Sequence, residues 1–279
     1  MRRLHLVNLS LPKTGTKSIA GLFANFRARH EYQFEAATKI LEAYHHRRVE
    51  RTDLSAFLLT RDTLGHLEVD SASVNFWFAD LFVELFPQAR FLVVLREPYA
   101  WLESVLAHLQ RDVVEMKAHG LPYPASFRRL ADVSGINFDP RSAESPDDFR
   151  GTMPFLSRQM LEFWCEQNTR LMRVVPPHRR LVLQTDDLSR SHNALSRFVG
   201  VKTEMLDVEA GHLHRRPDKS TLLAPCVRDS IEDALGSRPS HLWSEIKRLV
   251  VTDISAAGTS DAAQSGENTQ QGVVSQSRV

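Results

Sequence analysis

The sequence predicts an α/β fold of three layers, with a central parallel sheet between two layers of helices. Apolar segments at 4–11 and 91–95 are each followed by residues at helical spacing, and a third, 181–183, follows a long amphipathic stretch. Strands that alternate with helices are typical of parallel sheets covered on both faces. The segment FLVVL at 91–95 has no polar position, as expected of a doubly buried strand. Ligands of such sheets bind beyond the carboxyl ends of the strands, so the residues that follow these segments are the first site candidates.

The first element is expected to be a short strand. Apolar residues dominate positions 4–11, and Pro12 follows directly. After the loop, apolar residues between 19 and 26 recur at helical spacing. His5 and Asn8 interrupt the apolar opening before any small-residue cleavage site, so a strand explains it better than a secretory signal. The opening therefore predicts a strand, a loop and a helix.

Helices are expected between the first two strands. Amphipathic stretches occupy about 34–44 and 54–64, and a third at about 74–86 ends before a proline. The strand at 91–95 leads into a further helix over about 101–109. The order of elements thus stays compatible with a parallel sheet.

The second half of the chain is expected to be less regular. Residues 119–152 are rich in Pro, Ser, Gly and Asp with little periodicity, which predicts a long irregular insertion of the kind that is usually functional. A helix over about 154–174 precedes the strand at 181–183. Residues 255–279 have no apolar face and are expected to form a disordered tail, which leaves 1–254 as the folded domain.

Composition limits the function. The chain has 279 residues, of which 42% are hydrophobic, enough for a sizeable core. Lys and Arg total 35 against 34 Asp and Glu, so nothing predicts a nucleic-acid partner, and any anion site must be local. No segment approaches the roughly 18 to 20 apolar residues of a membrane helix. Cys165 and Cys226 have no metal-like spacing and suit a reducing, cytoplasmic environment.

The segment PKTGTKS, residues 12–18, is a candidate phosphate-binding loop. A triphosphatase loop needs a glycine where Ser10 stands and a lysine directly after the second glycine, but Gly15 is followed by Thr16. Lys13 is instead placed to reach over an anion held by backbone amides at a helix start. Lys17, in the first helical turn, is expected to be secondary. The alternative is that the glycine and the hydroxyls form an ordinary turn and N-cap.

A second anion-binding element is expected after the strand at 91–95. Arg96 stands at the strand end, and Ser104 follows eight positions later on the next helix. An arginine can hold a phosphate by two parallel hydrogen bonds, and a nearby hydroxyl can add a third. The alternative for Arg96 is an ion pair with Glu97 or Glu103.

These two motifs resemble those of the sulfotransferases that use 3′-phosphoadenosine 5′-phosphosulfate (PAPS). Their first motif, P-K-x-G-T-x-S/T-L, is similar to residues 12–19, and their second, an Arg with a Pro two and a Ser eight positions later, is similar to Arg96, Pro98 and Ser104. The resemblance implies the sulfotransferase fold, a relative of the P-loop nucleotide kinases. It also implies that the 3′-phosphate is held by Arg96 and Ser104 and the 5′-phosphosulfate by Pro12, Lys13, Thr14, Gly15, Thr16, Lys17 and Ser18.

The resemblance implies a reaction. A sulfuryl group is expected to pass from PAPS to a hydroxyl or an amine of a small-molecule acceptor such as a natural product. We expect the insertion at 119–152 to lie on the acceptor side. Positioning and electrostatics should dominate the loose in-line transition state, as in phosphoryl transfer. Lys13 is then the catalytic cation at the departing 5′-phosphate oxygen. The pattern is similar to soluble bacterial members, for which we expect a monomer or a homodimer.

The resemblance further implies that a His or a carboxylate before the 74–86 helix takes the acceptor proton. Asp70 is the first candidate, because it can cap that helix and also face the site, and Glu68 and His66 are alternatives. Asp70 is equally well explained as a plain N-cap residue.

One family motif is missing. Cytosolic sulfotransferases carry R-K-G-x-x-G near the C-terminus, and the nearest basic stretch here is HLHRRPDKS at 212–220. Arg215 and Arg216 are expected to close over the 3′-phosphate, with a solvated basic turn as the alternative.

No metal site is predicted. His45-His46 and His212-x-His214 have no further ligand at a recognisable spacing, and the sulfuryl donor needs none. Two other functions stay open: a nucleotide-binding module without catalysis, and an ATP-dependent small-molecule kinase. The kinase is disfavoured because Asp186 is the only near candidate for a magnesium ligand after an apolar strand.

Overall fold

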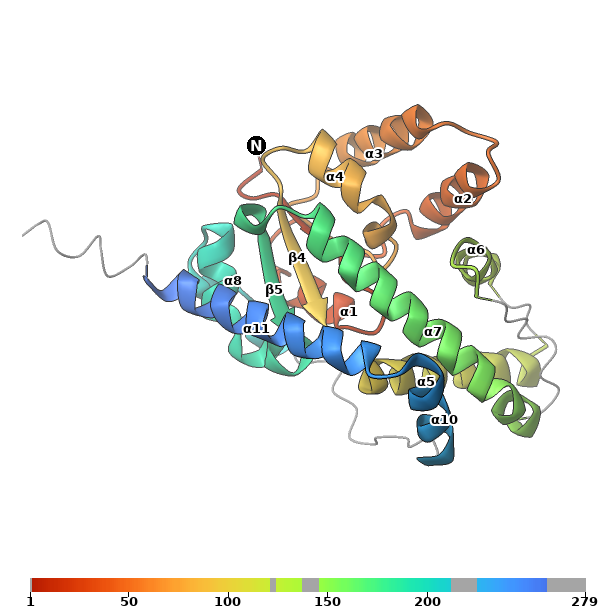
Figure 1. Ribbon diagram of the computed structural model, residues 1–279. Coiled ribbons are helices and arrows are strands. Elements are labelled where there is room, and N and C mark those ends of the chain that lie inside the picture. The colour runs from red at the N-terminus through yellow and green to blue at the C-terminus, as the bar shows by residue number, and fades with distance from the viewer. Residues whose placement is uncertain (1, 121–123, 137–145, 212–224, 260–279) are drawn as a thin grey trace, which may run out of the picture.

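The computed structural model describes residues 2–120, 124–136, 146–211 and 225–259. The described residues form a five-stranded parallel sheet in the order β2-β3-β1-β4-β5. Its strands are β1 (Leu6–Asn8), β2 (Ala28–His30), β3 (Val69–Ser71), β4 (Arg90–Leu95) and β5 (Arg180–Gln184). Figure 1 shows β4 and β5 side by side in the centre of the molecule. The three strands predicted from apolar segments are therefore confirmed as β1, β4 and β5.

Helices surround this sheet. The α-helices are α1 (Thr16–Leu22), α2 (Phe34–His45), α3 (Arg51–Gly65), α4 (Ala79–Leu85), α5 (Pro98–Ala118), α6 (Ala125–Val133), α7 (Pro146–Val174), α8 (His192–Val199), α9 (Val208–Gly211), α10 (Pro225–Leu235) and α11 (Arg238–Thr259). Short 3-10 helices are η1 (Asn75–Phe78), η2 (Pro177–Arg179), η3 (Thr185–Arg190) and η4 (Thr203–Met205).

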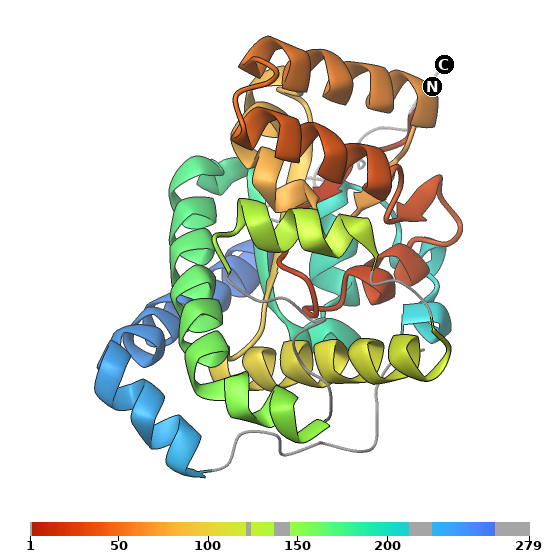
Figure 2. The same ribbon diagram turned by 90° about the vertical axis from the view of Figure 1, so that its right-hand side faces the viewer.

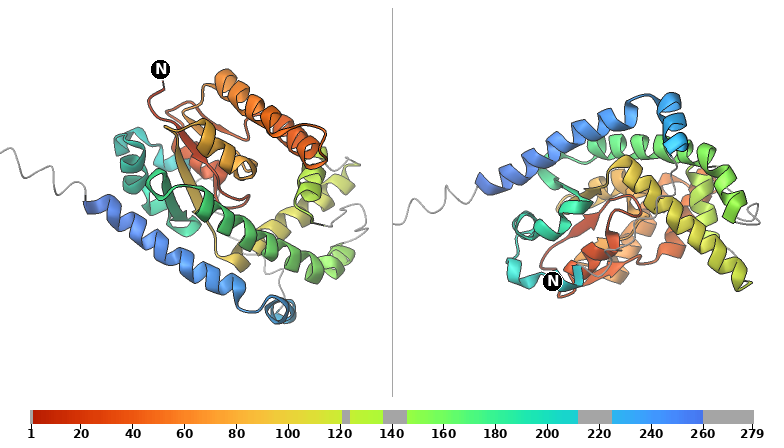
Figure 3. Two further views of the ribbon diagram at one scale, coloured as in Figure 1. Left: turned by 45° about the horizontal axis from the view of Figure 1, so that its top comes forward. Right: turned by 90° about the horizontal axis from the view of Figure 1, so that it is seen from below.

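The sheet is covered on both faces, which confirms the three-layer α/β fold. Side chains alternate along β4: Phe91 and Val93 join one hydrophobic cluster, whereas Leu92 and Val94 join another. The first cluster includes buried residues of α2, α3, α4, α5 and α7, and the second includes residues of α1 and α8. Figures 1 and 3 show α11 running alongside α7, which it contacts.

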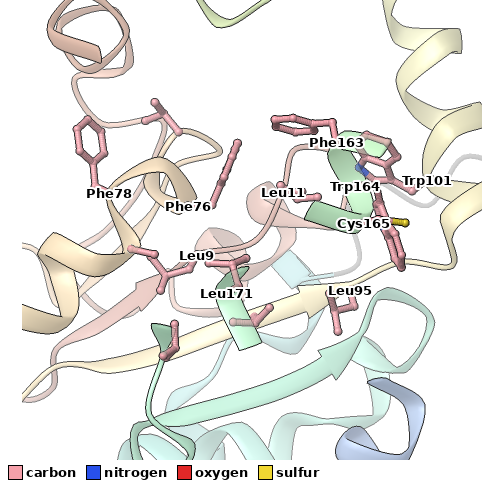
Figure 4. Packing of buried hydrophobic residues seen from close by; sticks show 14 of the residues in the cluster. Leu9, Leu11, Phe76, Phe78, Leu95, Trp101, Phe163, Trp164, Cys165 and Leu171 are labelled. Carbon is pink, nitrogen blue, oxygen red and sulfur yellow. The ribbon is translucent and has the colours of Figure 1, made fainter. Parts of the chain in front are cut away.

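The larger cluster joins the sheet to α5 and α7. Trp101 of α5, Trp164 of α7 and Leu11 are almost fully buried in it, together with Cys165 (Figure 4). Burial raises the pKa of the Cys165 thiol to about 11, so this free cysteine is an unreactive core residue. Packing at this cluster fixes α5 over the carboxyl ends of the strands.

The strand order creates a switch point at β1. This strand pairs with β3 on one side, where Leu6 lies opposite Val69, and with β4 on the other, where Asn8 lies opposite Leu92. From β1 the chain passes to the edge strand β2, returns to β3 beside β1, and then crosses to β4 and β5. Ligands of open α/β sheets bind at such a reversal, and the segments after β1 and β4 meet there.

Two strands were not predicted. β2 and β3 have three residues each, too few for a period-2 pattern, and β2 consists of the partly or fully exposed residues 28–30. The predicted helix at 74–86 is divided into η1 and α4. Asp70 lies inside β3, and the residue before η1 is Val74, so Asp70 does not cap that helix as expected.

The region 119–152 is more helical than expected. Residues 125–133 form α6. α7 begins at Pro146, a residue type that suits the first turn of a helix, and Pro154, where the helix was expected to begin, lies inside it. The predicted domain boundary at 254 falls within α11, and residues 260–279 of the predicted tail lie outside the described residues. Of the helices described, none combines the length and the apolar character needed to span a membrane.

Candidate active site

The loop at 12–14 is held by side chains of neighbouring elements. Each of its three carbonyl oxygens accepts a hydrogen bond: Pro12 O from Trp101 Nε1 at 2.8 Å, Lys13 O from Arg96 Nη1 at 3.3 Å, and Thr14 O from Thr185 Oγ1 at 3.1 Å. The peptide bonds are trans, so each N–H points opposite to the carbonyl of the same peptide plane. The amides of residues 13–15 therefore face away from these donors, as in an anion-binding nest.

Positive φ angles shape this loop. Lys13 has φ 65° and Gly15, which precedes α1, has φ 102°. The Gly15 value lies beyond the left-handed region that other residues tolerate. A Cβ at this position would also lie 2.7 Å from Leu188 Cδ1. The loop conformation thus depends on glycine at position 15.

A buried polar network connects the loop to the neighbouring strands. Ser10 Oγ accepts a hydrogen bond from Val94 N at 2.6 Å and contacts the Asn8 side chain. Asn8 Nδ2 donates to Ser71 Oγ at 2.9 Å, and that hydroxyl donates to Thr16 O at 2.7 Å. The network connects both ends of the loop to β3 and β4. Ser10, which stands where a triphosphatase loop has glycine, is therefore a structural bridge.

The two lysines of the loop differ in environment. Lys17 is exposed on α1, whereas Lys13 is half-buried. Burial lowers the pKa of Lys13, the cations of Arg111 and Arg96 lower it further, and Asp112 acts in the opposite direction. An ammonium group that is poorly hydrated and close to other cations gains most from binding an anion. The structure thus gives Lys13 the environment expected of an anion ligand.

The second predicted anion-binding element, formed by Arg96 and Ser104, lies next to the loop at 12–18. Arg96 directly follows β4, and burial lowers the pKa of its guanidinium. Among the described residues it forms no ion pair, so the alternative of pairing with Glu97 or Glu103 is not realised; the Glu97 carboxylate instead accepts from Ala100 N at 2.7 Å. Ser104 is half-buried on α5, three residues beyond the tryptophan that binds the loop.

Asp70, the first candidate for proton transfer, is buried in an ion pair. Its two carboxylate oxygens accept hydrogen bonds from the guanidinium of Arg61, one at 2.9 Å, and Asn75 Nδ2 donates to Oδ1 at 3.0 Å. Arg61 is itself only 4% exposed. Both carboxylate oxygens of Asp70 are therefore occupied by donors from neighbouring side chains.

The two alternatives lie at the other edge of the sheet. Glu68 and His66 precede β3, at the amino ends of the strands, whereas the loop follows the carboxyl end of β1. Hydrogen bonds from Arg3 hold the pKa of Glu68 at about 2. The structure therefore does not bring Glu68 or His66 to the loop. Arg215 and Arg216 lie outside the described residues.

Sequence reasoning missed His30 and Glu31, at the carboxyl end of β2. Glu31 Oε1 accepts a hydrogen bond from Ser73 N at 3.0 Å, and Oε2 is buried with no hydrogen-bond partner among the described residues. Burial raises the pKa of Glu31. His30 Nε2 lies 3.2 Å from Oγ1 of Thr16, the first residue of α1. The sequence could have indicated these residues only through topology. A strand that follows α1 in a parallel sheet has its carboxyl end at the same sheet edge as that of β1.

The polar face of α5 extends the site beyond Ser104. His108 lies one turn further along α5, with Nδ1 at 2.9 Å from Arg111 Nη2 and 3.2 Å from Asp112 Oδ1. The spacing of these residues places them on the helix face that begins with Trp101. The candidate active site thus combines the loop after β1, the end of β2 and one face of α5.

Comparison with known proteins assigns this chain to a family. A family described as the sulfotransferase domain matches residues 5–208, which include the loop, Arg96, Ser104 and β5. Among solved structures, the crystal structure of a sulfotransferase from Alicyclobacillus acidocaldarius is similar to this chain with a TM-score of 0.48 and 19% sequence identity. The alignment covers 88% of this chain and 97% of that one. No curated protein sequence matches this chain.

Proposed function

Because this chain belongs to the sulfotransferase domain family, as the match over residues 5–208 shows, we propose that it transfers a sulfuryl group from PAPS to a small-molecule acceptor. The acceptor group is a hydroxyl or an amine, for instance of a natural product. One observation carries the choice of donor: Arg96 Nη1 donates to the main-chain oxygen of Lys13 at 3.3 Å, so two anion-binding elements adjoin. A nucleotide phosphorylated at both the 3′ and the 5′ position needs two such elements.

Each part of the site has a proposed role. The amides of residues 13–18 and the Lys13 ammonium hold the 5′-phosphosulfate, and Arg96 and Ser104 hold the 3′-phosphate. Bound there, the donor supplies the sulfuryl group that the acceptor takes. Lys13 stabilises the charge that develops on the departing 5′-phosphate oxygen, where a preorganised cation contributes most. Lys17 is exposed and contributes little.

We assign acceptance of the acceptor proton to Glu31 in place of Asp70. Glu31 has one carboxylate oxygen without a partner among the described residues, whereas both oxygens of Asp70 are taken by Arg61. A raised pKa also suits Glu31 to this role, since a general base works best when its pKa approaches the working pH. Asp70 then has a positioning role, because it anchors Arg61, which also donates to Tyr32 O, one residue beyond Glu31.

The alternatives are a nucleotide-binding module without catalysis and an ATP-dependent kinase. Ser10 counts against the kinase, because its side chain fills the position where a triphosphatase loop needs glycine, and Thr16 stands where that loop needs lysine. The free, buried Cys165 suits a reducing compartment, so we include a cytoplasmic location in the proposal.

The proposal is tested by following sulfuryl transfer directly. The full chain is incubated with PAPS carrying radioactive sulfur and with a panel of phenols, alcohols, sugars and amines. We expect radiolabelled product and stoichiometric 3′-phosphoadenosine 5′-phosphate in the presence of at least one acceptor class. The same panel with ATP labelled at the γ-phosphate and Mg²⁺ is the control. Transfer of phosphate from ATP, with none of sulfate from PAPS, would contradict the proposal.

A further inference from the structure

The end of α2 and the end of α6 bring three potential metal ligands together. Within the described part of the chain, the ligand atoms of His45, His46 and Asp132 all lie within 4.8 Å of one another. His46 Nε2 lies 2.8 Å from Asp132 Oδ2, and the rings of His45 and His46 are 5.1 Å apart. The sequence alone shows only the histidine pair, because the third group lies 86 residues away from His46.

The donor set has a defined chemistry. Two imidazoles and one carboxylate are ligands that Zn²⁺ accepts, and three protein ligands leave a fourth position for water. Zinc–ligand bonds of about 2.0 to 2.2 Å place tetrahedral ligand atoms roughly 3.3 to 3.6 Å apart. One observed separation, 2.8 Å, is shorter than this value, and none exceeds 4.8 Å. All three side chains are exposed, so small rotamer changes are enough to close the site.

Both ligand-bearing segments have a fixed backbone. The end of α2 is closed by hydrogen bonds from His46 N to Glu42 O at 3.0 Å and from Arg48 N to Ala43 O at 2.8 Å. The end of α6 is closed by a hydrogen bond from Gly135 N to Asp132 O at 3.0 Å. Metal binding would therefore order side chains without refolding the backbone, which keeps its entropic cost low.

The packing of α6 on α2 holds the ligands in register. Arg129 of α6 pairs with Glu35 of α2 and donates from Nε to Thr38 Oγ1 at 3.2 Å. The ring of Phe127 lies 6.1 Å from that of Phe34 in α2 and 6.3 Å from that of His108 in α5. In Figure 2, α6 accordingly lies between α2 and α5.

We propose that His45, His46 and Asp132 form a zinc site that fastens α6 to α2. The site is separate from sulfuryl transfer and does not depend on the proposed function. Its effect is structural: α6 has nine residues, and a helix of this length depends on tertiary contacts for its stability. Because α6 also contacts His108, bound zinc fixes the helix that adjoins the polar face of α5.

The test is a titration of the full chain, prepared without a polyhistidine tag and freed of metal with EDTA. Zn²⁺ binding is measured by calorimetry. Co²⁺ binding is measured by the visible absorption of the Co²⁺ ion, which becomes stronger when the ion is held in a tetrahedral site. We expect one equivalent of Zn²⁺ to bind and to raise the melting temperature. Asp132→Asn, which keeps the shape of the side chain but removes its charge, should weaken Zn²⁺ binding at least tenfold.

His241→Gln is the matched control, because His241 is exposed on α11 and adjoins one carboxylate, that of Glu245. It should leave Zn²⁺ affinity unchanged. His46→Gln provides a second test of the same site and should also weaken binding at least tenfold; circular dichroism verifies that each variant is folded. Unchanged affinity in both Asp132→Asn and His46→Gln would overturn the proposal, since Zn²⁺ would then bind elsewhere.

Discussion

Arg96 donates a hydrogen bond from Nη1 to the main-chain oxygen of Lys13, at a distance of 3.3 Å. This contact joins the strand end of β4 to the loop after β1, so two cations from distant parts of the sequence share one edge of the sheet. Burial lowers the pKa of both side chains. Neither forms an ion pair with a described residue, so both cations can pair with a bound polyanion.

The first prediction concerns the two lysines of the loop. Lys13→Ala should lower kcat/KM by about two to three orders of magnitude, corresponding to ~3 to 4 kcal/mol of lost transition-state stabilisation. Lys17→Ala is the matched control and should change kcat/KM only a few-fold, because Lys17 is exposed. Initial rates with PAPS and one accepted substrate measure both variants. Equal losses in the two variants would show that Lys13 has no special role.

The second prediction concerns recognition of the 3′-phosphate. Arg96→Ala should weaken binding of 3′-phosphoadenosine 5′-phosphate by about ten- to hundred-fold, as expected from losing hydrogen bonds to a charged group. Binding of adenosine 5′-phosphate, which lacks the 3′-phosphate, should change much less. Arg190→Ala, which removes an exposed arginine on η3, serves as the control for lost charge. If Arg96→Ala weakened the binding of both ligands equally, Arg96 would not bind the 3′-phosphate.

The candidate site was only partly predictable from sequence. The loop at 12–18 and the Arg96–Ser104 pair have local spacing that the chemistry requires, and the structure brings them to one sheet edge. Glu31 was missed because the strand before it has three residues and no apolar alternation. The ion pair of Asp70 with Arg61 depends on how α3 packs on β3, which no local pattern encodes.

The third prediction concerns the pH dependence of stability. Burial raises the pKa of Glu31, so its contribution to stability is fully present below the unfolded-state pKa and is lost as pH rises through the folded-state value. Glu31→Gln stays neutral at every pH. Its melting temperature relative to the unmodified protein should therefore increase from pH 4 to pH 8, as measured by circular dichroism. A constant difference over this range would contradict the raised pKa.

The fourth prediction compares two glycines with positive φ. Gly15 has φ 102° and Gly200 has φ 75°, and a Cβ at Gly200 would meet nothing within 4 Å. Gly200→Ala should cost about 1 to 2 kcal/mol, the price of a left-handed alanine. Gly15→Ala should cost more and should also abolish nucleotide binding, because the loop would change shape. Urea unfolding and titration with 3′-phosphoadenosine 5′-phosphate measure the two effects. Intact nucleotide binding by Gly15→Ala would show that the loop tolerates a side chain there.

The choice of donor is tested most directly by calorimetric titration of the full chain with 3′-phosphoadenosine 5′-phosphate and, separately, with ATP and Mg²⁺. The paired anion sites at Lys13 and Arg96 predict that 3′-phosphoadenosine 5′-phosphate binds at least about ten-fold more tightly, a difference of ~1.4 kcal/mol. ATP binding of equal or greater affinity would contradict the assignment of PAPS as the sulfuryl donor.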